Sequence, residues 1–221
     1  MPSAGKPVKQ MSENARVLST DLVSKLRIEI LAERMKPGDK VTEQAICERF
    51  SVSRTPVREA FKNLESEGLL EMVPNRGAFV IGLTACDIRD LYAIRMQNEM
   101  QAVRWAIERR TKEEMDSIEE SLDFMRFYTE RSDAKRMRSI NSNFHKRIAA
   151  ASHNRILADS LARIQDYTRY SSRVLPYLET DLAVILKEHK AIFSAFKSSD
   201  TEAGALAMKK HIENSLKRAK V

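Results

Sequence analysis

The chain has 221 residues, of which 43% are hydrophobic and 31% are charged. This length suffices for two modest domains with buried cores, and no apolar run reaches the roughly 18 residues that a membrane-spanning helix needs. The formal net charge of +7 suits a polyanionic partner. The basic excess is not localised, because residues 1–82 hold 13 basic and 11 acidic side chains and residues 83–221 hold 25 and 20. Composition therefore permits a nucleic-acid partner without identifying one.

Residues 1–15 are polar, contain glycine and proline, and lack the apolar stretch of a signal peptide. We expect them to form a flexible N-terminal arm. Cys47 and Cys86 fall on different predicted elements without metal-ligand spacing, which is typical of buried free thiols in a reducing cytosol. A cytoplasmic protein with no membrane partner is therefore expected.

Two helices are predicted ahead of residue 51. Apolar residues recur at helical spacing over residues 21–31, and Lys-Pro-Gly-Asp at residues 36–39 then ends that helix with a turn. Thr42 is a suitable N-cap for a second, short helix over residues 43–50. A short turn follows, so the order is that of a helix-turn-helix motif.

The third helix is predicted between Ser53, its N-cap, and Gly68, which ends it. Its buried stripe consists of Val57, Phe61 and Leu64. Arg54, Thr55 and Arg58 lie off this stripe near the N-terminal end, where a recognition helix presents side chains to base edges and phosphates. An ordinary amphipathic helix would explain the stripe equally well, but it would not explain the elements on either side. We therefore take Ser53 and these three residues as candidate DNA contacts.

A β-hairpin is predicted after this helix. Residues 69–73 are apolar and partly β-branched, Pro-Asn-Arg-Gly at 74–77 forms the turn, and residues 78–81 form the returning strand. Arg76 lies at the tip, where an arginine can enter a minor groove or contact phosphate. A solvated hairpin arginine is an equally good interpretation of this residue alone.

Four motifs occur in order along residues 16–82: Met35-Lys-Pro-Gly38, Ser53-Arg-Thr-Pro-Val-Arg-Glu-Ala60, Leu64-Glu-Ser-Glu-Gly-Leu69 and Asn75-Arg-Gly-Ala-Phe-Val80. Together they resemble the winged-helix domain of the GntR family of bacterial transcription regulators. The resemblance implies that Arg54, Thr55 and Arg58 contact operator DNA and that Gly77 approaches the minor groove. The family often has arginine where this chain has Gln44, which keeps hydrogen bonding but removes a charge from a DNA contact.

The second half, residues 83–221, predicts only helices, as expected of a helical bundle. The predicted helices cover residues 84–110, 111–131, 133–152, 154–175, 180–198 and 201–219.

Several polar residues fall on the apolar faces of these helices, where they are costly unless something satisfies them. They are Arg95, Glu99, Asn141, His145, His189 and His211. Three imidazoles and one carbonyl-type oxygen suit a divalent transition ion with open positions for water or ligand. A single inward histidine is more often a core residue hydrogen-bonded to a neighbour, so the pattern alone leaves both interpretations open.

The same polar residues form motifs: Arg95-Met-Gln-Asn-Glu99, Asn141-Ser-Asn-Phe-His145, Glu188-His189 and His211. They resemble the FCD effector-binding domain of the FadR subfamily of GntR regulators. The resemblance implies a divalent ion such as zinc or nickel and a small carboxylate effector that completes its coordination. The implied metal ligands are Asn141, His145, His189 and His211. Arg95 and Glu99 match an Arg-x-x-x-Glu pair, which we assign to the effector site.

We make a separate prediction for each of three residues in this half. Asn141 stands where many members have Asp, so the site has one negative charge fewer, and a net-positive site favours an anionic effector. His153 replaces a usual glycine and is interpreted as a helix C-cap, not as a fourth ligand. Arg95 is either a buried ion pair with Glu99 that fixes packing or a bidentate clamp for an effector carboxylate.

The sequence therefore predicts a mainly α protein. A winged helix-turn-helix domain with three helices and a hairpin wing covers residues 16–82, and an all-α bundle of about six helices covers residues 83–221. We expect a transcriptional regulator, most simply a repressor, that binds operator DNA as a homodimer and responds to a small organic acid. A metalloenzyme would need an acid or base beside the metal, and Glu99 is the only inward carboxylate we can nominate. A DNA-binding module with a purely structural metal is the other alternative.

Overall fold

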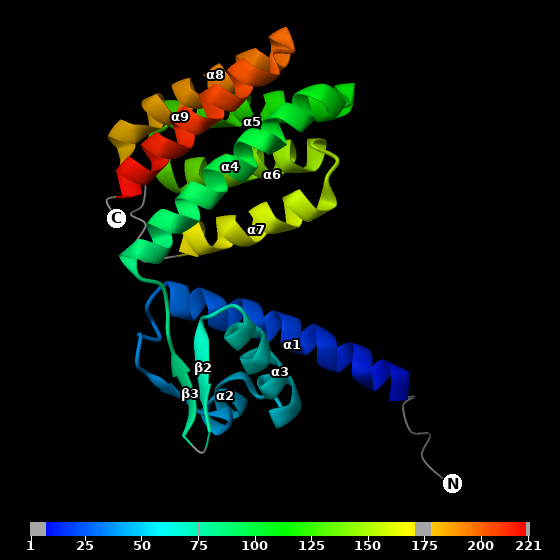
Figure 1. The fold of residues 1–221 in the computed structure, drawn as a ribbon, viewed down its shortest axis with the longest axis vertical. Helices are drawn as coiled ribbons and strands as arrows, with labels where there is room; N and C mark the ends of the chain where they lie inside the picture. Colours follow the sequence, from blue (N-terminus) through cyan, green and yellow to red (C-terminus); the bar gives the residue numbers. More distant parts are fainter. Residues whose placement is uncertain (1–7, 75, 171–177, 220–221) are drawn as a thin grey trace. The chain divides into compact units, whose positions relative to one another are not determined.

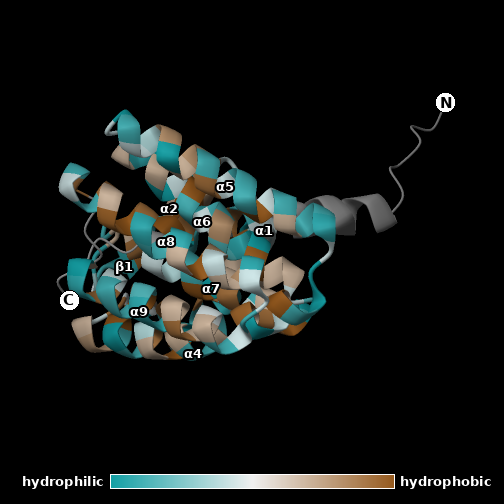
Figure 2. Ribbon diagram, turned by 90° about the horizontal axis from the view of Figure 1, so that it is seen from above, coloured by the Kyte–Doolittle hydropathy of each residue, from teal (hydrophilic) through white to brown (hydrophobic). Residues whose placement is uncertain are grey.

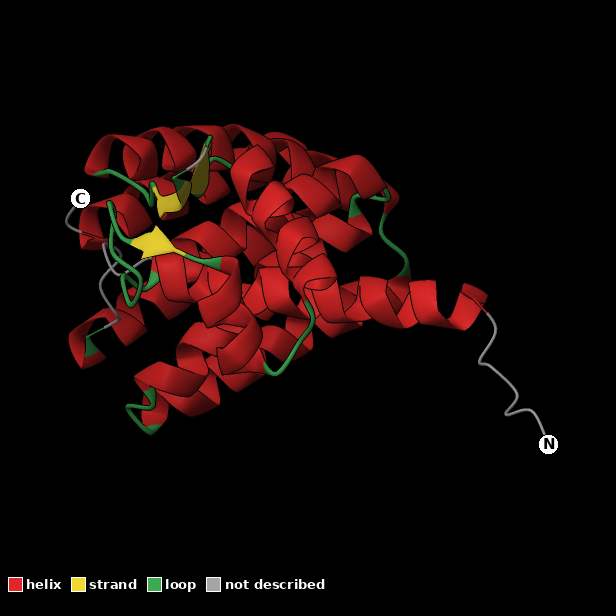
Figure 3. Ribbon diagram, turned by 90° about the horizontal axis from the view of Figure 1, so that it is seen from below, coloured by secondary structure: helices red, strands yellow, loops and turns green. Residues whose placement is uncertain are grey.

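The computed structural model of the chain describes residues 8–74, 76–170 and 178–219. The chain divides into two compact units, with the boundary between Thr84 and Ala85 (Figure 1). Helices make up most of the described chain, and the strands form one small sheet (Figure 3). The mainly α fold class is thus confirmed. None of the described helices is long and apolar enough to cross a membrane.

The first unit has the predicted winged helix-turn-helix elements. They are α1 (Val8–Leu31), β1 (Lys40–Val41), α2 (Glu43–Phe50), α3 (Arg54–Ser66), β2 (Leu70–Val73) and β3 (Gly77–Val80). The strands pair antiparallel in the order β1-β3-β2, with Val73 opposite Gly77 at the wing turn. Strand β1 was not predicted, because two residues are too few to show strand alternation. It is recognisable only through its pairing with β3.

Helix α1 begins earlier than predicted. It starts at Val8, so residues 8–15 are helical where a flexible arm was expected, and residues 1–7 lie outside the described residues. The physical reason lies in the sequence, since neither glycine nor proline occurs between Val8 and the end of the helix at Leu31.

The turn between α2 and α3 follows the predicted capping, with one difference. Thr42 caps α2 by accepting a hydrogen bond from the Ala45 amide at 3.2 Å, and Ser51 ends α2 in the left-handed conformation with φ of 52°. Ser53 occupies the N-cap position of α3, as predicted, but its hydroxyl makes no capping hydrogen bond. The predicted stripe of α3 is fully confirmed, because Val57, Phe61 and Leu64 are all buried.

Among its described residues, the second unit has the six predicted helices and one additional short 3-10 helix. They are α4 (Ala85–Arg109), α5 (Lys112–Glu130), α6 (Ala134–Ala151), α7 (Arg155–Tyr170), η1 (Glu179–Asp181), α8 (Leu182–Ser198) and α9 (Thr201–Ala219). The predicted end of the fourth of these helices and the break at Pro176 lie outside the described residues. His153 has φ of 52° directly after α6, as expected of the residue that reverses the chain there.

The helices of the second unit are amphipathic and bury their apolar faces against one another. Helix α4 packs on α9 and α6, and α5 packs on α6 and α8. Apolar and polar residues alternate around these helices in Figure 2. Cys47 on α2 and Cys86 on α4 are free thiols, as predicted, but the expectation that they are buried is wrong, because Cys47 is half-buried and Cys86 is exposed.

Gly204 on α9 allows the close contact between α9 and its neighbours. A Cβ atom there would lie 2.7 Å from the Ile107 Cδ1 atom and 2.8 Å from the Val103 Cγ1 atom, both on α4. Alanine is the better helix former, but these distances are too short for side chains in a packed core. We expect Gly204→Ala to lower the free energy of unfolding by about 1–3 kcal/mol. Urea denaturation measures the change.

The control for this prediction is Ala203→Leu, which changes an exposed neighbour on the same turn of α9. It should leave the urea midpoint within error of the wild-type value. A Gly204→Ala variant as stable as the wild type would contradict the packing argument.

Candidate DNA-binding surface and metal centre

The N-terminal end of α3 presents the predicted contact residues to solvent. The exposed side chains are Ser53, Arg54, Thr55 and Arg58, and Gln44 is exposed on the first turn of α2. Their exposure follows from the opposite face of α3, whose apolar stripe fixes how the helix lies on the core. Four cationic or hydroxyl-bearing positions next to a helix N-terminus form a surface suited to phosphates and base edges.

Two glutamates of α2 accept hydrogen bonds from predicted DNA-contact residues. Arg58 Nε donates to Glu43 Oε1 at 2.7 Å, and this hydrogen bond raises the pKa of Arg58. Gln44 Nε2 donates to Glu48 Oε1 at 2.9 Å, one helical turn along α2. Sequence reasoning did not single out either glutamate, because nothing in the spacing of α2 indicates which groups of α3 it meets.

The wing places Arg76 and Gly77 beside the start of α2. The Arg76 guanidinium lies 5.6 Å from the centre of the Phe79 ring, a cation–π contact. Gly77 has φ of +98°, a conformation that other residues rarely adopt, which explains why glycine stands there. A hollow of about 270 Å³ is lined by both wing residues and by Thr42 and Glu43. The wing and the helix-turn-helix motif thus belong to one continuous exposed region of the first unit.

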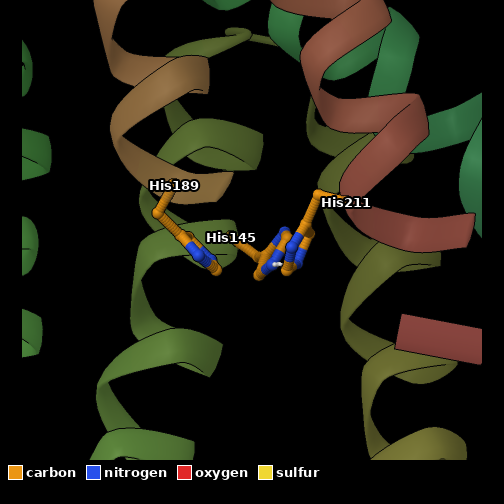
Figure 4. Close-up of side chains that lie close together, drawn as sticks. All are labelled: His145, His189 and His211. Atoms are coloured by element: carbon orange, nitrogen blue, oxygen red, sulfur yellow. Dashed lines mark hydrogen bonds between the residues drawn. The ribbon is translucent and has the colours of Figure 1, made fainter. Parts of the chain in front are cut away.

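The second unit brings the three inward histidines together. His145 on α6, His189 on α8 and His211 on α9 are buried, and one ring nitrogen from each lies within 4.8 Å of the other two (Figure 4). The ring centres of His189 and His211 are 4.4 Å apart. Three separate helices supply these residues, so the cluster exists only because α6, α8 and α9 pack with their histidines facing each other.

One buried carboxylate, Glu99, and one half-buried carboxylate, Glu188, orient two of the rings. His145 Nδ1 donates to Glu99 Oε2 at 2.9 Å, and His211 Nδ1 donates to Glu188 Oε2 at 2.8 Å. Burial raises the pKa of each carboxyl group, but the partners of Glu99 and Glu188 outweigh burial and lower each pKa to about 2. Ionised carboxylates can only accept, so Nδ1 of each ring carries a proton and Nε2 faces the other histidines. Such carboxylate–histidine pairs are the usual outer partners of metal-ligating histidines.

The third ring and a nearby amide leave polar atoms without partners. His189 Nδ1 donates to the Ile185 carbonyl at 2.7 Å, which directs its Nε2 atom away from the backbone. Burial lowers the pKa of His189 well below its ordinary value, so the ring is neutral. Within the described part of the chain, His189 Nε2 and Asn141 Oδ1 are buried and have no hydrogen-bond partner. Buried acceptors of this kind call for a cation or a donor group that protein atoms do not supply.

The distance between His145 Nε2 and His211 Nε2 is 3.2 Å. Burial lowers the pKa of His211 to about 4, so this ring is also neutral near pH 7. At that distance the two nitrogens either share a proton in a hydrogen bond or both bind a metal ion, because two lone pairs alone would repel one another. Two imidazole ligands of a tetrahedral zinc ion stand about 3.3 Å apart, given Zn–N bonds of about 2.0–2.1 Å. The donor atoms therefore fit a divalent transition ion.

Arg95 and Glu99 form the buried ion pair that the sequence allowed. Arg95 Nε donates to Glu99 Oε1 at 3.2 Å, and both side chains are almost wholly excluded from solvent. Glu99 thus uses one oxygen for Arg95 and the other for His145. Burial is the largest cause that lowers the pKa of His211, and the Arg95 charge adds to it. Because Glu99 bonds to both Arg95 and His145, the guanidinium lies close to the histidine cluster.

Glu188 and its partners adjoin His211 and were not among the predicted ligands. Arg218 donates to both Glu188 oxygens at 3.0 and 2.9 Å, and Asn214 Nδ2 donates to Oε1 at 2.8 Å. His211, Asn214 and Arg218 share one face of α9, so their spacing of three and seven residues was the available signal. His153, by contrast, is exposed and bonds to Glu114 at 3.0 Å, away from the cluster.

Comparison with known proteins identifies both units. The family model described as bacterial regulatory proteins, gntR family, matches residues 18–80, and the FCD domain model matches residues 90–214.

Two curated relatives and one solved structure agree with these matches. An uncharacterized HTH-type transcriptional regulator of Bacillus subtilis, YdhC, is 32% identical over 188 residues, which cover 84% of this chain and 83% of the relative. The HTH-type transcriptional repressor RspR of Escherichia coli is 30% identical over 193 residues, which cover 85% and 82%. The solved structure of E. coli McbR/YncC superposes with a TM-score of 0.73 at 21% identity, covering 92% of this chain and 97% of that one, and so shares the fold.

Proposed function

Because this chain belongs to the GntR family of bacterial transcriptional regulators and carries an FCD domain, we propose that it is a repressor whose operator affinity is set by a small carboxylate. The chain is a DNA-binding regulator and not an enzyme. The FCD domain is consistent with the FadR subfamily, to which we assign the chain. Repression is supported by RspR, a relative whose name describes a repressor.

The DNA contacts in this proposal come from two elements of the first unit. Arg54, Thr55 and Arg58 read the major groove from α3, with Ser53 and Gln44 at the adjoining helix starts. Arg76 and Gly77 approach the minor groove from the wing. Their common exposure supports these roles, as does the match of the surrounding sequence to the gntR family model. A homodimer in the bacterial cytoplasm would place two such surfaces on one palindrome.

The metal in this proposal is zinc or nickel, and its ligands are Asn141, His145, His189 and His211. The observation that carries the proposal is the convergence of three imidazoles whose Nδ1 atoms are all engaged by acceptors. The ion would supply positive charge to a bound anion. Glu99 and Glu188 hold two of the rings in the required tautomer, and Asn141 adds an oxygen without adding negative charge.

Arg95 is the effector contact in this proposal. A carboxylate effector gains two parallel hydrogen bonds from a guanidinium, and Arg95 lies inside the bundle beside the histidine cluster. Glu99 holds the guanidinium in place through Nε. Effector binding would then favour one spacing of the paired DNA-binding units over another.

Titration of the zinc-loaded or nickel-loaded full-length chain with a panel of small organic acids tests this proposal. An effective acid should weaken binding to an operator duplex, and Arg95→Ala should raise the acid concentration needed by about tenfold or more, since a charged hydrogen bond of about 1.5–3 kcal/mol is lost. Arg104→Ala is the matched control, because Arg104 lies on the same helix and pairs with Glu202 instead.

Each outcome of this titration has a defined meaning. An unchanged response of Arg95→Ala would remove Arg95 from the effector site. If no acid alters operator binding by the wild-type chain at fixed metal content, the metal is structural and the effector proposal is wrong.

A further inference from the structure

Glu43 places a negative charge within the surface that meets the DNA backbone. It lies on the first turn of α2, and its carboxylate is 30% exposed beside the exposed Arg58 side chain. A carboxylate at this position repels phosphates and so weakens binding to every duplex alike. An ion pair between exposed groups contributes little to folding stability, so stability does not compensate for that loss.

The contact between Glu43 and Arg58 indicates what compensates for this loss of DNA affinity. Glu43 Oε1 accepts from Nε of Arg58 at 2.7 Å, which engages one edge of the guanidinium. The opposite edge, formed by the two terminal nitrogens, is the one that donates two parallel hydrogen bonds to guanine O6 and N7. An arginine has many rotamers, and fixing one of them before binding removes an entropic cost from the bound state.

Glu43 is itself held in a fixed place. Thr42 caps α2 immediately before it, and Ile46, one turn later, is buried in the core of the first unit. Acidic side chains on the first helical turn are also stabilised by the helix dipole. The backbone of Glu43 is therefore held in place, so its carboxylate reaches Arg58 on α3 from a fixed point on α2.

We infer that Glu43 is a positioning residue that sets DNA sequence specificity by orienting Arg58. It lowers the affinity for all DNA and raises the ratio of operator to non-operator binding. The inference rests on the proposal that Arg58 contacts a base of the operator.

Selection of duplexes from a random oligonucleotide pool tests this role with full-length protein. The pool is selected separately by the wild type and by Glu43→Gln, Glu43→Asp, Arg58→Ala and Glu59→Gln. Base preference is compared position by position, and affinity is measured for the wild-type-selected duplex and for a scrambled duplex at one salt concentration.

Glu43→Gln and Glu43→Asp should relax base preference at the same position as Arg58→Ala. Both should lower the ratio of selected to scrambled affinity by roughly fivefold or more, since a bidentate base contact is worth about 1–3 kcal/mol of discrimination. The aspartate keeps the charge but is one methylene shorter, so it separates positioning from charge. Glu43→Gln should also bind the scrambled duplex more tightly than the wild type does.

Glu59→Gln is the matched control, because it removes one exposed negative charge from the residue that follows Arg58 on α3. It should raise affinity for both duplexes and leave their ratio and the base preferences unchanged. Adding Glu43→Gln to Arg58→Ala should cause no further loss of specificity.

Three results would overturn the inference. Wild-type base preferences in Glu43→Asp would show that charge alone matters. Relaxation at a position that Arg58→Ala leaves intact would show that Glu43 acts on another group. Failure of the wild type to enrich any duplex would overturn the proposed DNA contacts together with this inference.

Discussion

Replacing His189 with alanine is expected to abolish metal retention by the full-length chain. His189 is wholly buried, and its Nε2 atom has no partner among the described residues. Loss of an outer partner of a metal-ligating histidine typically costs about 10–100-fold in metal affinity, so loss of the ligand itself should cost about a hundredfold or more. Elemental analysis of freshly purified protein and the change in melting temperature on adding zinc or nickel measure the effect.

His153→Ala is the control for this prediction, because it removes an exposed histidine that bonds to Glu114 and lies away from the cluster. It should retain the wild-type metal content and the wild-type rise in melting temperature. The His189 variant should still bind an operator-containing duplex in the absence of metal, since the first unit has a core of its own. Equal metal content in the wild type and in His189→Ala would refute the ligand assignment.

Replacing Arg54 with alanine should weaken operator binding by about 1–3 kcal/mol if the arginine reads a base. Arg54 is exposed at the start of α3, so the change removes a cation without disturbing the core. The melting temperature of the variant should therefore equal that of the wild type. Fluorescence anisotropy with a labelled operator duplex at several salt concentrations gives the affinities.

The salt dependence separates the two modes of contact. If Arg54 contacts phosphate instead, binding to all duplexes weakens alike and the slope of log affinity against log salt falls by about one. Arg155→Ala provides a matched control, because Arg155 is exposed on α7 in the second unit and pairs with Asp159 one turn away. Undiminished operator binding by Arg54→Ala would remove this residue from the DNA contacts.

Local signals in the sequence were sufficient for the helix-turn-helix motif and the wing. Thr42, the stripe of α3 and the glycine at residue 77 each act within a few residues, through capping, apolar spacing or backbone conformation. The same reasoning did not predict that α1 begins at Val8, and it did not predict strand β1. The first residues of α1 contain no strong start or stop signal for a helix. Strand β1 depends on a partner strand almost forty positions further along the chain.

The amino-acid sequence by itself determined which residues are available to the metal centre. Helical periodicity puts Asn141 and His145 on one inward face and puts His189 and His211 on two others. Their roles as ligands are still predictions, and so is the effector role of Arg95.

Only the tertiary structure decided which atoms meet. Periodicity fixes the face of each helix, but the rotation and height of one helix against another depend on how the whole core packs. The bonds of Glu99 to His145, of Glu188 to His211 and of Glu43 to Arg58 join separate helices and follow from that packing alone. For this reason the partners of the histidine rings and of Arg58 could be read from the packed helices and not from the sequence.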